Sequence, residues 1–271
     1  MSLRLETVLT LLLSLALLFG CKAFDKAASS SSDGENSNSP TARANTSAPD
    51  GEPDEDGFIP SGTGTEKEKP SPGKGNVQGK AMFNEQPAAG VEVKLCKTFS
   101  QFAGGCGGET FKTKTDASGD YLIKDVPPGE YEGLTVQVFN TPYYVFATSG
   151  FVSAAKYKIE ADETYFAPDT HLFKNDLKVT NPKAGSKVAP EGIEVSWDAY
   201  PDAAYYKMSV HADTSSGAET DYDLINKRVD GTSFAVDKPL TPGSYTVKVE
   251  AFNANDRKLS QSSNDMKFSV K

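Results

Sequence analysis

Apolar and polar residues alternate along most of the chain after residue 76. In the run 91–95, three apolar side chains alternate with Glu92 and Lys94. The same pattern recurs in the runs 134–138, 193–197, 206–210 and 247–251. Alternation of this kind places the apolar side chains on one face of a half-buried strand. Because no stretch of this region shows a helical period, the pattern predicts an all-β fold.

Turn-forming residues separate the predicted strands at short intervals. In the first half they gather at 84–90, 116–119 and 127–129. Several short strands at such spacing are typical of a β-sandwich. The runs fall into two groups, residues 74–173 and residues 174–271. The sequence therefore predicts two tandem sandwiches of the immunoglobulin-like or prealbumin-like kind.

The first group contains three motifs in a fixed order. GVEVKL at 90–95 is followed by TDASGDY at 115–121, and VPPGEY at 126–131 precedes another strand. This layout resembles the carboxypeptidase regulatory-like (transthyretin-like) β-sandwich, and the resemblance implies a non-catalytic accessory module. We expect the segment 116–119 to be a hairpin turn and Tyr131 to pin the corner made by Pro128 and Gly129.

A second interpretation of the turn is a cation site. Asp116, Ser118 and Asp120 have the alternating oxygen spacing of a calcium loop. However, the run lacks the twelve-residue length and the terminal glutamate of such a loop. The turn interpretation is favoured, and no metal site is predicted.

The second group carries a tryptophan and a tyrosine in informative places. Trp197 lies on an early strand, where it can fill the space between two sheets. The segment 240–245 has the layout of a tyrosine corner that ends in Tyr245. Together with Asn181 and Pro182, these features resemble a fibronectin type III-like domain, which implies a spacer or a binding module.

The N-terminus has the pattern of an export signal. Arg4 precedes a largely apolar run from residue 8 to 19, which is shorter than a membrane span requires. The ending Leu18-Phe19-Gly20-Cys21 resembles the lipobox of bacterial lipoproteins. The resemblance implies that residues 1–20 are a signal peptide and that Cys21 is the acylated lipid anchor. In a Gram-negative host, Lys22 implies transport to the outer membrane. The alternative is an ordinary secretory signal that ends beside an unrelated cysteine.

Residues 21–73 are rich in Ser, Asn, Pro, Gly and acidic residues. Their few apolar side chains predict a disordered acidic linker. An acidic cluster at 50–56 could bind a metal or a partner, although solvated repulsion is the favoured interpretation. The chain has a net charge of −9, and neither predicted sandwich is basic. Nucleic acid is therefore not expected as a partner.

Two features of the first sandwich are candidate sites. Cys96 and Cys106 are close in sequence, so a disulfide is expected after export, with a two-cysteine metal site as the alternative. The stretch 139–146 is rich in aromatic residues beside a turn. Tyr143, Tyr144 and Phe146 are candidate ligand contacts, and core or edge packing is the alternative.

No pattern in the sequence indicates catalysis. His171 and His211 lack companions at metal-ligand or catalytic spacing, and no nucleophile or phosphate-loop motif occurs. We expect no cofactor. The sequence predicts a non-catalytic lipoprotein of the cell envelope, anchored in the membrane by lipid, that binds a glycan or a protein partner. The alternative is a structural spacer or scaffold with no small ligand.

Overall fold

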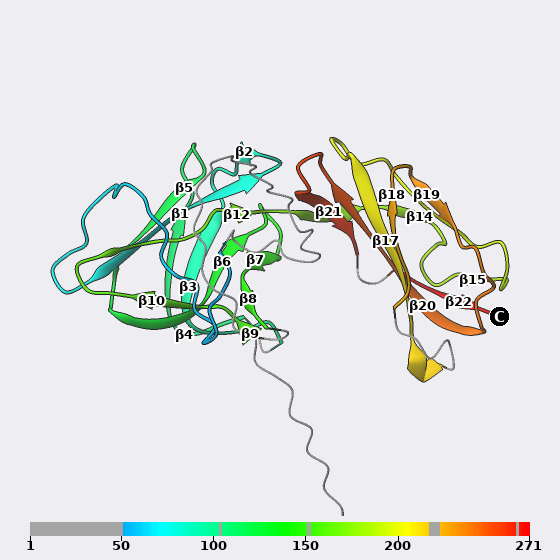
Figure 1. Cartoon of the computed structure of the whole chain (residues 1–271), viewed down its shortest axis with the longest axis horizontal. Coiled ribbons are helices and arrows are strands. Elements are labelled where there is room, and N and C mark those ends of the chain that lie inside the picture. The colour runs from blue at the N-terminus through cyan, green and yellow to red at the C-terminus, as the bar shows by residue number, and fades with distance from the viewer. Residues whose placement is uncertain (1–50, 103–104, 151–152, 217–222, 264–265) are drawn as a thin grey trace, which may run out of the picture. The chain divides into compact units, whose positions relative to one another are not determined.

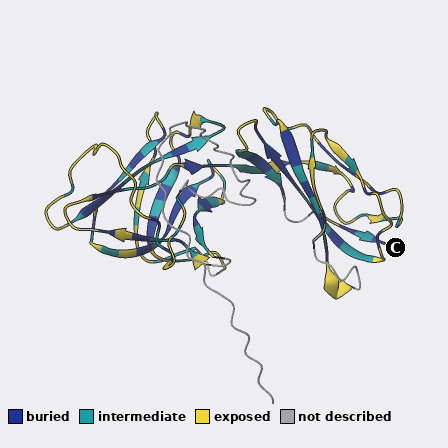
Figure 2. Ribbon diagram, viewed as in Figure 1, coloured by how far each residue is buried: buried dark blue, intermediate teal, exposed yellow. Residues whose placement is uncertain are grey.

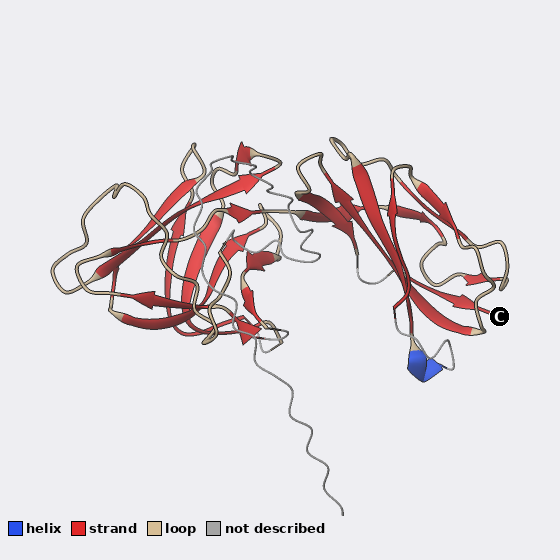
Figure 3. Ribbon diagram, viewed as in Figure 1, coloured by secondary structure: helices blue, strands red, loops and turns tan. Residues whose placement is uncertain are grey.

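The computed structural model of the 271-residue chain describes residues 51–102, 105–150, 153–216, 223–263 and 266–271 (Figure 1). The predicted signal peptide, the anchor Cys21 and the linker up to residue 50 lie outside these residues. All the described regular elements are β-strands, apart from one 3-10 turn, η1 (Thr214–Ser216), so the predicted all-β class is confirmed (Figure 3). None of the described residues belongs to a helix that is long and apolar enough to cross a bilayer.

The first sandwich contains two five-stranded sheets. In one sheet, β1 pairs with β5 and β2 antiparallel and with β11 and β12 in parallel. The other sheet has the order β10-β6-β3-β4, and β7 lies beside β6. A short hairpin, β8-β9, connects β7 to β10. The strands are β1 (Gly75–Phe83), β2 (Gln86–Pro87), β3 (Glu92–Ser100), β4 (Gly105–Lys114), β5 (Asp120–Val126), β6 (Gly129–Gln137), β7 (Tyr144–Phe146), β8 (Thr148–Ser149), β9 (Ser153–Ala154), β10 (Lys156–Ile159), β11 (Thr164–Phe166) and β12 (Thr170–His171).

The second sandwich contains a larger and a smaller sheet. The seven-stranded sheet has the order β13-β21-β20-β17-β18, and β22 joins it to β15. The three-stranded sheet has the order β14-β16-β19. The strands are β13 (Lys174–Leu177), β14 (Val179–Asn181), β15 (Lys187–Val188), β16 (Glu194–Trp197), β17 (Tyr205–Ala212), β18 (Asp223–Val229), β19 (Ser233–Ala235), β20 (Gly243–Phe252), β21 (Lys258–Ser262) and β22 (Lys267–Val270).

The alternating runs supply the cores of both sandwiches (Figure 2). Each apolar residue of the five runs is buried, with at most 5% of its surface exposed. Trp197 packs between the sheets against Tyr206, with ring centroids 5.4 Å apart. Burial of these faces is the main favourable term in the fold.

Two tyrosines pin corners of the chain. The Tyr131 hydroxyl donates a hydrogen bond to the carbonyl of Pro127 at 2.8 Å, and the Tyr245 hydroxyl donates to Thr241 at 2.7 Å. Both rings are buried. The two predicted corners are therefore confirmed. In each corner, the hydrogen bond provides the hydroxyl of a buried tyrosine with a partner.

The segment before β1 differs from its expected role as linker. Ile59 is 1% exposed and belongs to the core of the first sandwich. Its amide donates to the carbonyl of Lys156 on β10, and its carbonyl accepts a hydrogen bond from the Tyr165 hydroxyl on β11. The amide of Gly62 then donates to the carbonyl of Phe166. Residues 57–62, here called the N-terminal strap, thus bind to both sheets, and the packed structure begins well before residue 74.

The acidic cluster initiates this strap. The Asp54 side chain accepts hydrogen bonds from the amides of Asp56 and Phe58, at 3.0 and 2.8 Å. The amide of Gly57 donates to the carbonyl of Asp54. A carboxylate that accepts local amides in this way forms a turn. Asp54 therefore orients the chain so that Ile59 reaches the core.

Candidate functional site

Aromatic side chains lie on the outer face of the sheet β10-β6-β3-β4 and in the loops beyond the ends of β3 and β7. On β7, Val145 points into the core and is 2% exposed, whereas Tyr144 and Phe146 are half-buried on the opposite face. Successive side chains of a strand point to opposite faces, so this arrangement follows from the sequence. The set here called the aromatic strip consists of Phe99, Tyr144 and Phe146 on the sheet, together with the exposed loop residues Phe102 and Tyr143 beyond the ends of β3 and β7.

Lys94 fixes the position of Tyr144. Its ammonium group lies 4.8 Å from the centre of the Tyr144 ring and donates to the hydroxyl at 3.0 Å. The same ammonium forms an ion pair with Glu92 at 2.8 Å. The Glu92 hydrogen bond, followed by that of Tyr144, raises the pKa of Lys94 above its ordinary value. The site therefore combines an oriented ring with a stable positive charge and a carboxylate.

Phe99 and Phe146 form the middle of the strip. Their ring centroids are 4.6 Å apart, at an interplanar angle of 53°. The Phe99 side chain lies directly over Gly133 of β6, where an added Cβ would be 2.5 Å from it. Gly133 also has a φ of +65°, which side chains other than glycine rarely adopt. Glycine at this position therefore leaves room for the Phe99 ring of β3 to lie over β6 and contact Phe146 of β7.

The two ends of the strip are the most exposed large apolar side chains among the described residues. Phe102 is 78% exposed, beyond the end of β3, and Tyr143 is 54% exposed, in the turn before β7. The register of β3, β6 and β7 places Tyr143 and Phe102 at opposite ends of the sheet. Because β3 has 9 residues, the strip extends over about 30 Å.

A disulfide supports the end of the strip that carries Phe102. Cys96 and Cys106 are joined across the β3–β4 hairpin, with Cα atoms 5.3 Å apart, as expected from their spacing. Cys96 is fully buried. The bond restrains the hairpin that presents Phe102, although residues 103–104 lie outside the described residues.

The sequence identified three of the five members of the strip. Tyr144 and Phe146 lie on the outer face, on the side of β7 opposite the buried Val145, whereas Tyr143 is exposed in the turn before β7. Phe99 and Phe102 were missed. Register shifts between β3 and its neighbours around Cys96 break the simple alternation that would place Phe99. Phe102 could have been found from the sequence, because it is a large apolar residue in a polar, glycine-rich loop.

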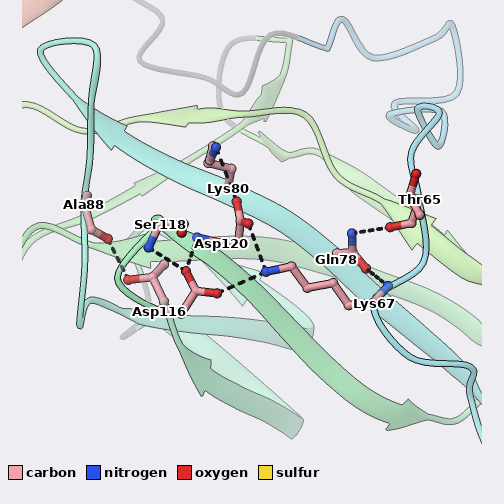
Figure 4. Close-up of polar contacts among 9 residues, drawn as sticks. Thr65, Lys67, Gln78, Lys80, Ala88, Asp116, Ser118 and Asp120 are labelled. Atoms are coloured by element: carbon pink, nitrogen blue, oxygen red, sulfur yellow. Dashed lines mark hydrogen bonds and ion pairs between the residues drawn. The ribbon is translucent and has the colours of Figure 1, made fainter.

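A hollow beside the turn 116–119 is a second candidate. It has a volume of about 270 Å³ and is lined by Thr63, Gly64, Gln78, Gly79, Lys80, Asp120, Phe166, Ala167 and Asp169. Figure 4 shows the charges at its edge. The ammonium of Lys67 lies between the carboxylates of Asp116 and Asp120, at 3.0 and 2.9 Å. A lysine therefore occupies the place that a metal ion would take.

The turn itself is confirmed. The Asp116 carboxylate accepts hydrogen bonds from the amides of Ser118 and Asp120, at 2.8 and 3.0 Å (Figure 4). The hydrogen bond from Lys67 is the main cause that lowers the pKa of Asp116. Across the described ranges, no three histidine, cysteine or acidic side chains are placed to hold a metal ion. The arrangement supports a structural role, in which Lys67 attaches the segment before β1 to the turn.

The second sandwich has a serine–histidine pair on β17. Ser209 Oγ and His211 Nε2 are 2.9 Å apart on the outward face of the strand. A hollow of about 250 Å³ lies nearby, beside His211, Asp213 and Lys267. The Ser215 hydroxyl donates a hydrogen bond to the Asp213 carboxylate at 2.6 Å, and this bond is the main cause that lowers the pKa of Asp213.

Comparisons with known proteins give no family assignment: no family model and no curated protein matches the chain. Several solved structures are similar at low sequence identity. The FN1-FN3 domains of chicken CNTN1 are 15% identical, with 79% of this chain and 69% of that chain covered and a TM-score of 0.26. The major pilin subunit BcpA of Bacillus cereus is 14% identical, with 73% and 69% covered and a TM-score of 0.26. A putative carbohydrate binding protein from Bacteroides uniformis is 10% identical, with 70% and 95% covered and a TM-score of 0.25. At these TM-scores the similarities carry no functional argument.

Proposed function

We propose that the chain is a non-catalytic binding module of the cell envelope that holds an extended carbohydrate chain along the aromatic strip. In this proposal Cys21 is the lipid anchor, and the residues up to about 50 connect it to the sandwiches. The first sandwich is of the carboxypeptidase regulatory-like type and the second is fibronectin type III-like.

The aromatic strip is the observation that carries the proposal. Rings spread over about 30 Å along one sheet suit a linear ligand better than a compact one. A sugar ring has a face of C–H groups that packs on an aromatic ring, and its hydroxyl groups need hydrogen-bond partners at the edges. Lys94 and Glu92 supply a donor and an acceptor beside Tyr144. Apolar rings with a few fixed polar groups are typical of ligand sites.

The test is a glycan array probed with the purified full-length protein, followed by calorimetry with any glycan that binds. The ring stacking of one aromatic side chain is worth about 1.5 kcal/mol, so Tyr144→Ala should weaken binding by about ten-fold. Phe102→Ala should weaken the binding of long chains more than that of short ones, because Phe102 lies at the end of the strip. Tyr143→Phe keeps the ring and should bind as the unaltered protein does.

Two outcomes would contradict the glycan proposal. One is the absence of binding to any glycan together with recovery of envelope proteins only, which would favour the spacer role. The other is unchanged glycan binding in the variant that combines Tyr144→Ala with Phe102→Ala. Lipid anchoring is tested separately: inhibition of lipoprotein signal peptidase should leave an uncleaved precursor, and unchanged processing would exclude acylation of Cys21.

A further inference from the structure

Cationic side chains gather on the outward face of the large sheet of the second sandwich. Lys207 of β17 lies opposite Arg228 of β18 and, on its other side, opposite Glu250 of β20. Adjacent strands are about 4.8 Å apart, so these residues form a row across the sheet. Lys248 and Lys258 both form ion pairs with Glu250, each at 3.0 Å. The face, here called the cationic face, therefore has four cations, of which Lys248 and Lys258 pair with the buried Glu250. Two further carboxylates lie at its edge: Asp256, which accepts a hydrogen bond from the Tyr205 hydroxyl, and Asp230.

Aromatic rings hold two of these cations in place. The guanidinium carbon of Arg228 lies 3.5 Å from the centre of the Tyr205 ring. Lys207 Nζ lies 4.6 Å from the centre of the Phe252 ring. Tyr205 and Phe252 are themselves stacked, with centroids 5.1 Å apart and an interplanar angle of 5°. Cations fixed on rings lose less entropy when they bind a ligand than mobile ones do.

These cations are weakly neutralised within the protein. Arg228 has a carboxylate neighbour in Asp230, but their closest atoms are 3.7 Å apart and the Asp230 side chain is 84% exposed. No carboxylate in the described part of the chain forms an ion pair with Lys207. The side chain of Arg228 is 61% exposed, so its N–H groups face solvent. Such a surface attracts an anion even though the whole chain carries a net charge of −9.

We infer that the cationic face binds an acidic polysaccharide, with Arg228 and Lys207 in contact with successive acidic groups. A protein partner or a membrane surface would normally be met by exposed apolar anchors. The exposed large apolar side chains of the described residues, Phe102 and Tyr143, both belong to the first sandwich. A polymer of acidic sugars needs only spaced cations and hydrogen-bond donors. This inference does not depend on the aromatic strip, because it concerns another sandwich.

Calorimetry of the full-length protein with polygalacturonate tests the inference, and the fully methyl-esterified polymer is the matched neutral ligand. We expect binding to the acidic polymer alone, and weaker binding at higher salt, because salt screens exposed charges. Arg228→Glu should lower the affinity by about ten-fold. The matched control is Lys227→Glu, which changes the net charge equally. Lys227 lies opposite Met208 and so belongs to the other face of the sheet, and its replacement should leave binding within about two-fold. Fluorescence of Trp197 during melting verifies that both variants fold.

Three results would overturn the inference. They are the absence of binding to polygalacturonate, equal binding of the methyl-esterified polymer, and equal loss of affinity in the two charge variants. Vesicles that contain phosphatidylglycerol provide a further arm: if they bind the protein in an Arg228-dependent manner and polygalacturonate does not, the ligand is a lipid surface. The variant Tyr144→Ala should retain polygalacturonate binding, so failure of the aromatic strip and failure of the cationic face are distinguishable.

Discussion

Replacement of Ile59 by alanine tests the contribution of the N-terminal strap to the first sandwich. Ile59 lies 16 positions before the first residue of β1, yet its side chain is 1% exposed and packs in the core. The backbone amide of Ile59 donates to Lys156, and its backbone carbonyl accepts a hydrogen bond from the Tyr165 hydroxyl. Because both groups of Ile59 belong to the backbone, these bonds persist in the variant. The substitution therefore removes packing and leaves the polar contacts in place.

The expected loss of stability follows from the burial. Isoleucine loses three carbon atoms on replacement by alanine, and each buried methylene contributes about 0.8 kcal/mol. The cavity left behind adds to the loss, because the surrounding core relaxes only partly. We expect Ile59→Ala to lower the free energy of unfolding of the first sandwich by about 3 kcal/mol, and Ile59→Val by about 1 kcal/mol.

Urea unfolding followed by circular dichroism measures the effect. Trp197, the only tryptophan, reports the second sandwich by fluorescence and serves as the internal reference. Glu55→Ala alters an exposed side chain of the same segment and is the matched control. Hydrogen exchange of the Lys156 amide, which donates to Gly57, reports detachment of the strap directly.

The reasoning would be refuted by a loss below about 0.5 kcal/mol for Ile59→Ala, the size typical of an exposed site. Cleavage by a protease within residues 57–62 of the native protein would contradict it in the same way. Either result would mean that the strap is a mobile part of the linker.

Three further predictions concern single features of the sandwiches. Replacement of both Cys96 and Cys106 by serine should cost about 3 kcal/mol in urea unfolding, since their sequence separation is 10 and the bond limits the unfolded chain; a loss below 1 kcal/mol would contradict this. Burial acts to raise the pKa of Glu250, but the charges of Lys258 and Lys248 outweigh burial, so the pKa is lowered. The ionised carboxylate therefore stabilises the folded protein above the unfolded pKa of about 4.3. This stabilisation is lost as the pH falls from that value through the lower pKa of the folded state. The melting temperature of Glu250→Gln should therefore fall less between pH 6 and pH 3 than that of the unaltered protein, and equal slopes would contradict the ion pairs. The Tyr121 hydroxyl is buried with no hydrogen-bond partner in the described structure, so Tyr121→Phe should leave the melting temperature unchanged or raise it, and a clear decrease would reveal a missing partner.

Local pattern was sufficient to predict the strands, the corners and the disulfide. Alternation with a period of two specifies which side chains are buried, whichever strands become neighbours. The hydroxyls of Tyr131 and Tyr245 each bond to a carbonyl four residues earlier in the chain, so their signal is local as well. The alternation of Tyr144, Val145 and Phe146 likewise accounts for the outer-face position of the two rings.

Features that join distant segments were not predictable in this way. The linker composition around Ile59 indicates disorder, because a short apolar pair among polar residues gives no period. Its position in the core depends on hydrogen-bond partners on β10 and β11, which come much later in the chain. Similarly, Lys67 is one charge among many in the sequence, and its position between two carboxylates depends on the path of the segment before β1.

By itself the sequence determined that the chain forms two layered β units, which residues are buried, and where turns and the disulfide occur, because these depend on neighbours within a few positions. The tertiary structure alone decided that the strap completes the first core, that Phe99 packs against Phe146 on a neighbouring part of the sheet, and that Arg228 and Lys207 face one side of a sheet together. The physical reason is that strand order and register bring together residues far apart in sequence, and no local pattern encodes that pairing.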